Sequence, residues 1–278
     1  MVCAELPAPD PRSFTIFDLV RDRSDIGRIF YGIAIAGMGM ATICYNDFPY
    51  PLLPPHNFKI PGLAYVCGII FILGGVWLVI GKKARPAALL FGAALLLIFC
   101  FYYIPYELLI SHNYLSLGEW ENAEKELALA GGALAIANCF QQKDKNLLTR
   151  LLGKLAPVGA ILFGITIVCF SILHFVYAAQ AAGYIPSWIP FHLFWMYCCG
   201  AALLGSGIAI ILKIRTGFFA SLLGMMIFTW FIILHIPKVL EAAPAGRADE
   251  ITSALLALAY SGTAFVIAKS IKSPLRRN

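Results

Sequence analysis

Eight apolar stretches, each long enough to cross a lipid bilayer, constrain the fold of this chain more than any other feature. A membrane-spanning helix needs about 20 mainly apolar residues, because each residue adds about 1.5 Å along the helix axis. The stretches of this kind are 29–46, 61–80, 86–105, 122–140, 157–178, 191–212, 216–236 and 251–269. Since they occupy most of the chain, the sequence predicts an all-α, polytopic membrane protein with eight transmembrane helices.

The composition favours the same class of protein. Hydrophobic residues make up 60% of the chain and charged residues 13%, with a mean hydropathy of +0.79. Too few polar side chains are therefore present to cover a water-soluble globule. The strands of a membrane β-barrel alternate in polarity, and runs such as 87–101 do not.

Residues 1–28 form a separate leader in this interpretation. They hold four arginines and no uninterrupted apolar core, so no cleavable signal peptide is expected. Phe14, Phe17 and Val20 are spaced for a short amphipathic helix on the membrane surface. A polar tail is the alternative for this segment.

Lysine and arginine are divided unequally between the two sides of the predicted membrane. If the N-terminus is cytoplasmic, 17 of the 21 basic residues lie in cytoplasmic segments and 4 in external ones. The positive-inside rule then predicts a multi-pass protein of the inner cell membrane with both termini in the cytoplasm. The net charge of +6 follows from this orientation, so membrane lipid is the expected partner and nucleic acid is not.

The second half of the chain repeats the first. Residues 32–108 and 164–240 align without a gap and share sixteen identities in 77 positions, at an offset of 132 residues. The fourth spans align only after a small shift. Because four spans return a chain to its starting side, the sequence predicts two four-helix bundles of the same orientation. The predicted divisions are a leader 1–28, a first unit 29–140, a cytoplasmic linker 141–156, a second unit 157–270 and a basic tail 271–278.

Three histidines distinguish the two copies. His174, His192 and His235 fall at the outer ends of three neighbouring spans of the second unit, where the first unit has Thr42, Ile60 and Tyr103. Imidazole can accept a proton, ligate a metal or haem, or form a hydrogen bond with a quinone. The three histidines are therefore the candidate ligand-binding or metal-binding site, with Tyr177 and Trp195 as further candidates for its wall. The alternative is that they are interfacial residues in contact with water and lipid headgroups.

Other polar and sulfur-containing residues receive structural interpretations. Seven of the eight cysteines lie in or beside predicted spans without ligand spacing, and are expected to be packing residues. Glu119, Glu121, Glu124 and Glu126 open the fourth span and are expected to cap it at the outer surface, with Ser116 and Glu119 spaced as a capping box. No acidic or basic residue is expected in the centre of a span, and Glu107 is the nearest.

A set of short motifs in the run 174–240 has a known counterpart. They are His174 with Phe175, the Pro-x-Trp-x-Pro loop of Pro186, Trp188 and Pro190, the block from His192 to Trp195, a glycine-spaced sixth span, and His235 with Pro237. With these motifs the second unit resembles the DoxX family of small bacterial and archaeal membrane proteins. Members usually have one four-helix unit, so the resemblance implies a fused pair.

The resemblance implies a redox setting and no particular reaction. The family takes its name from a subunit associated with quinone-linked sulfur oxidation, and relatives are linked to thiol or redox homeostasis in the cell envelope. We therefore expect a redox-linked membrane component that holds a quinone, haem or metal and acts with a partner subunit. The alternatives are a transporter or lipid-handling protein, disfavoured by the absence of charge in the span centres, and an assembly subunit without chemistry.

Overall fold

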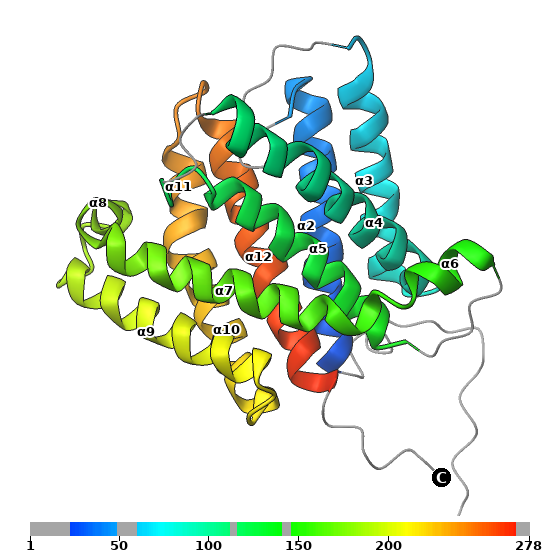
Figure 1. The fold of residues 1–278 in the computed structure, drawn as a ribbon. Helices are drawn as coiled ribbons and strands as arrows, with labels where there is room; N and C mark the ends of the chain where they lie inside the picture. The colour runs from blue at the N-terminus through cyan, green and yellow to red at the C-terminus, as the bar shows by residue number, and fades with distance from the viewer. Residues whose placement is uncertain (1–22, 49–59, 112–115, 141–145, 271–278) are drawn as a thin grey trace, which may run out of the picture.

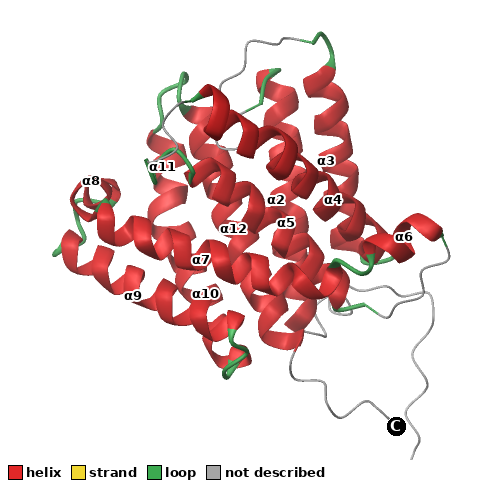
Figure 2. Cartoon of the chain, in the orientation of Figure 1, coloured by secondary structure: helices red, strands yellow, loops and turns green. Residues whose placement is uncertain are grey.

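The computed structural model describes residues 23–48, 60–111, 116–140 and 146–270, and in these ranges the chain is helical, without strands (Figure 2). The amphipathic segment expected at Phe14 to Val20, together with His56 and His112, lies outside the described residues.

Each predicted apolar stretch forms a helix. The long helices are α2 (Arg23–Tyr45), α3 (Leu63–Ile80), α4 (Ala84–Ile98), α5 (Glu121–Asn138), α7 (Gly159–Val176), α9 (His192–Ile211), α10 (Thr216–Trp230) and α12 (Arg247–Ser270). Two π-helical turns, η1 (Phe99–Tyr103) and η2 (Tyr106–Ile110), extend α4, while η5 (Phe231–His235) and α11 (Ile236–Glu241) extend α10. Shorter pieces are α6 (Leu147–Leu152), η3 (Ala156–Val158), α8 (Ala178–Ala181) and η4 (Ala182–Tyr184). The first helix begins within the predicted leader, at Arg23 instead of residue 29.

Seven helical stretches of the described chain are long and apolar enough to cross a membrane, so this is a multi-pass membrane protein by length and composition. They are Ile26–Tyr45, Leu63–Ile80, Ala84–Ile110, Leu147–Val176, His192–Ile211, Thr216–Glu241 and Arg247–Ser270. The eighth predicted span, α5, is not confirmed. It has the required 18 residues, but its first six include Glu121, Glu124, Lys125 and Glu126.

The long helices form a closed ring in which each contacts the next. The order around the ring is α2, α3, α4, α5, α7, α9, α10, α12 and back to α2. Helices α5 and α12 also touch each other across the middle (Figure 1). This contact divides the ring into a first chamber bounded by α2, α3, α4, α5 and α12, and a second chamber bounded by α5, α7, α9, α10 and α12.

The expected separation into two bundles is not confirmed, because helices from the two halves are interleaved. Helix α2 packs against α12, and α7 packs against α5. At the first of these contacts Gly27 and Gly262 bring the two backbones together: a Cβ added to Gly262 would lie 2.5 Å from the Gly27 carbonyl oxygen. Small residues of this kind allow close helix packing, which largely drives helix association within a membrane.

Two buried arginines close helix ends at the predicted cytoplasmic side. The Arg85 guanidinium donates to the carbonyl oxygens of Ala137 at 2.6 Å and Phe140 at 3.3 Å, at the C-terminal end of α5. Arg28 donates in the same way to Leu78 and Val79 at the end of α3. Each supplies donors and positive charge to carbonyls that have no helical partner.

The close contact between α2 and α12 predicts a position-specific effect of alanine. Gly262→Ala should lower the thermal midpoint of the purified protein, at a cost of about 1–3 kcal/mol for an overpacked site. Gly205→Ala on α9 is the matched control, because a Cβ there meets no atom within 4 Å. Equal midpoints for the two variants in a detergent thermal-shift assay would contradict this packing.

Candidate functional site

The second chamber contains a cavity of about 860 Å³. Helices α7, α9, α10 and α12 line it, and the first turns of α5 close one side with Glu121 and Lys125. Its volume lies within the range typical of small-molecule sites, about 300–1,000 Å³. Because α5 belongs to the first half of the sequence, both halves build the wall of this cavity.

Four of the five predicted site residues line this cavity, namely His174, Tyr177, Trp195 and His235. His192 does not: it is the first residue of α9, half-buried, and absent from the lining. Within the described ranges, no group of three or more His, Cys, Asp or Glu side chains is placed to hold a metal ion. The structure therefore brings two of the three candidate histidines to a common space.

His174 has a defined tautomer. Its Nδ1 lies 2.7 Å from the carbonyl oxygen of Phe170, one turn earlier on α7. Since a carbonyl only accepts, Nδ1 carries a proton in this bond. In the neutral ring Nε2 is then a hydrogen-bond acceptor.

His235 is held differently. It ends the π-helical turn η5, a kind of local distortion that is frequent at functional sites. It forms no hydrogen bond with the residues that the structure describes, and Lys125 and Lys238 lie within electrostatic range. Its ring is therefore not committed to one tautomer, and either nitrogen can donate to a ligand.

Aromatic rings form one wall between the two histidines. The indoles of Trp195 and Trp230 meet edge to face with 6.3 Å between centroids. Trp230 Nε1 donates to the Sγ of Cys199 at 3.0 Å, so this cysteine orients the ring in addition to filling space. The Tyr177 hydroxyl accepts a hydrogen bond from the Gly118 amide at 3.3 Å, which ties α7 to the turn before α5.

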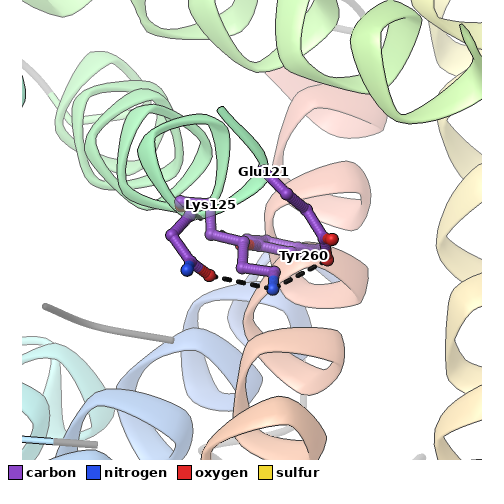
Figure 3. A network of polar contacts seen from close by, with 4 residues as sticks. Glu121, Lys125 and Tyr260 are labelled. Atoms are coloured by element: carbon purple, nitrogen blue, oxygen red, sulfur yellow. Dashed lines mark hydrogen bonds and ion pairs between the residues drawn. The ribbon is translucent and has the colours of Figure 1, made fainter. Parts of the chain in front are cut away.

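The outer end of the cavity is charged, and the opposite end is apolar. Figure 3 shows Lys125 bonded to Glu121 Oε1 at 2.8 Å and to Asn122 Oδ1 at 3.1 Å, beside the ring of Tyr260. The Lys238 ammonium lies over the Tyr184 ring, 4.6 Å from its centroid. Deeper along the same helices the lining consists of apolar residues, among them Ile167, Leu203 and Leu256. An amphiphile with a polar headgroup matches this distribution.

The expectation that the acidic residues of α5 are surface caps was wrong for Glu126. Its side chain is only 4% exposed, and α5 begins at Glu121 without a side-chain capping bond, so Ser116 and Glu119 do not form a capping box. Glu107 is buried too, at 2%. The span interiors thus do hold carboxyl groups. A sequence signal existed: Asn122, Glu126 and Leu129 recur at the spacing of one helix face.

Comparison of the chain with protein-family models, with curated proteins and with solved structures found no match.

The hydroxyl of Tyr260 predicts a measurable contribution to the wall. It donates to the carbonyl oxygen of Lys125 at 3.1 Å and joins α12 to α5. Tyr260→Phe should lower the free energy of unfolding by about 0.5–1.5 kcal/mol, the usual net value of one hydrogen bond. Tyr197→Phe, at a side chain 49% exposed, should leave the thermal midpoint unchanged. If Tyr260→Phe is as stable as the parent protein, this bond does not join the helices.

Proposed function

We propose that this chain is a DoxX-like protein of the inner cell membrane that binds a quinone headgroup in the cavity of the second chamber. The observation that carries the proposal is the placement of His174 and His235, from different helices, on one amphiphilic cavity.

The two imidazoles offer complementary hydrogen bonds. Nε2 of His174 can accept from a quinol hydroxyl, because Nδ1 donates to the Phe170 carbonyl. His235, which has no hydrogen-bond partner in the described chain, can donate to a quinone carbonyl. The indoles of Trp195 and Trp230 provide an aromatic surface for the ring, and the apolar depth of the cavity suits an isoprenoid tail.

A quinone is preferred to the other ligands considered from the sequence. A metal site is not proposed, because the described residues include no suitable group of three ligands and His192 lies off the cavity. Haem would need only two axial histidines, but the charged outer end and apolar inner end of the cavity correspond to a headgroup and tail. A haem absorption band in the purified protein would contradict the choice of quinone.

Matching structural details support an internal repeat. The π-helical turns η1 and η5 are 132 residues apart, the offset of the sequence alignment. The close glycine pairs Gly32 with Gly75 and Gly164 with Gly207 have the same offset. The contact of Gly27 with Gly262 has its counterpart in that of Gly159 with Gly131. A duplicated scaffold in which only the second copy kept a ligand site accounts for these features.

The proposed topology places α5 as an eighth crossing. It contacts α4, α7 and α12, and its residues from Ala128 to Ala137 are buried among them. With eight crossings both termini lie in the cytoplasm, where most of the basic residues then also lie. A redox partner subunit would supply or remove the electrons that a bound quinone exchanges.

Transport of a lipid or another amphiphile is the alternative. Glu126 and Glu107 favour it, because coupled transporters bury ionisable groups inside the membrane. Uptake by reconstituted liposomes that survives substitution of both cavity histidines would favour this function.

Quinone binding is measurable through the tryptophans of the cavity. Ubiquinone-1 titrated into the detergent-solubilised protein should quench the emission of Trp195 and Trp230. His174→Ala and His235→Ala should each weaken binding by about tenfold, which corresponds to a loss of about 1.4 kcal/mol.

His192→Ala is the matched control and should bind ubiquinone-1 like the parent protein. An equal loss in all three variants would restore the three-histidine site expected from the sequence. No quenching in the well-folded parent protein would refute quinone binding.

Reporter fusions test the crossing by α5. Alkaline phosphatase fused after Gly118 should be active, and green fluorescent protein fused after Asn146 should be fluorescent, because the two positions flank α5 on opposite sides of the membrane. Phosphatase activity at both positions would show that α5 does not cross.

A further inference from the structure

Glu126 stands apart from every other acidic residue described. Its side chain is 96% buried by the exposed fraction of 4%, and its Oε2 has no hydrogen-bond partner. It lies on α5, the helix shared by the two chambers, one turn after Asn122.

Three buried tyrosines surround this carboxyl group from different helices. Tyr31 on α2, Tyr103 on η1 and Tyr260 on α12 all lie within its electrostatic range. Two of their hydroxyls are directed to the backbone of α5: Tyr31 donates to Leu129 at 2.6 Å and Tyr260 to Lys125 at 3.1 Å. Glu107, on η2, interacts with the same Tyr103.

No positive charge compensates Glu126. The neighbouring Lys125 is bonded to Glu121 and Asn122, and Glu126 forms no ion pair with any residue in the described parts of the chain. An unpaired carboxylate in an apolar interior costs several kcal/mol, whereas the protonated acid carries no charge. The geometry therefore favours a neutral carboxylic acid at this position.

We infer that Glu126 is an internal proton-binding site that exchanges its proton with the second chamber through Tyr260. Tyr260 belongs both to the surroundings of Glu126 and to the wall of the cavity, so one side chain separates the carboxyl group from a ligand. On the first-chamber side Tyr103 lies between Glu126 and Glu107 in electrostatic range. The chain Glu107, Tyr103, Glu126, Tyr260 thus runs from the outer end of the first chamber to the cavity.

Comparison of the two copies supports a specialised role for this residue. Under the shift of 131 residues that pairs Gly131 with Gly262, Glu126 corresponds to Ala257, which lines the cavity. Tyr103 corresponds to His235. Where the second copy is open to a ligand, the first copy has a buried acid and a buried phenol.

The inference rests on the proposed binding of a quinone only for the use of the proton. A charge on Glu126 would draw water or the Tyr260 hydroxyl toward it and disturb the cavity wall, so the protonated state should bind the ligand more tightly. Other groups that face the cavity and titrate are His174, His235, Lys125, Lys238, Glu119, Glu121 and Glu250.

Infrared spectroscopy of the ligand-free protein tests the proton directly. The spectrum at neutral pH should contain a protonated carboxyl C=O band that shifts in D₂O and is lost in Glu126→Gln. Glu121→Gln, at an exposed carboxylate paired with Lys125, is the matched control and should retain the band. A band unchanged in Glu126→Gln would overturn the inference. So would a parent spectrum without such a band, a measurement that needs no variant.

Binding of ubiquinone-1 tests the link to the cavity. In the parent protein the dissociation constant should rise at least about fivefold from neutral to alkaline pH, the lower end of typical site-to-site coupling. In Glu126→Gln it should stay constant, because the side chain cannot lose a proton. The same pH dependence in both proteins would overturn the link. Absence of binding at every pH would refute the proposed function, while the infrared result would still decide whether Glu126 holds a proton.

Discussion

The contact between α5 and α12 is the constraint on which the rest of the structure depends. Gly132 of α5 lies directly against the Thr263 side chain of α12, so the two helices touch at the centre of the ring. Each is also the packing partner of the first helix of the other half, α7 for α5 and α2 for α12. Neither half is therefore complete alone, and both chambers have α5 and α12 as common walls.

This sharing explains why α5 is unlike the other helices. A helix surrounded by protein does not need to be apolar on every face, because its polar side chains meet other helices and a cavity rather than lipid. Lys125 and Glu121 line the second chamber, while Glu126 is directed into the first. The charges that disqualify α5 as an apolar span are the ones that bring polar chemistry inside the molecule.

The two chambers have diverged through a few substitutions in a common frame. The glycine contacts and π-helical turns are alike in both, whereas Tyr103 and Glu126 in one correspond to His235 and Ala257 in the other. Replacing a buried glutamate by alanine leaves room, and replacing a phenol by an imidazole adds an acceptor. Backbone packing is the shared property of the two copies, and side-chain volume distinguishes them.

The sequence by itself determined the helices and most of their bounds, because the length and apolarity of each stretch are local properties that the bilayer requires. It also identified His174, His235, Tyr177 and Trp195, through the mismatch between the copies. It did not distinguish His192 from the other two histidines, since equal depth along neighbouring helices does not specify which way a side chain faces. Only the tertiary structure decided that α5 from the first half closes the second cavity and that Glu126 is buried, because both follow from contacts between helices more than a hundred residues apart.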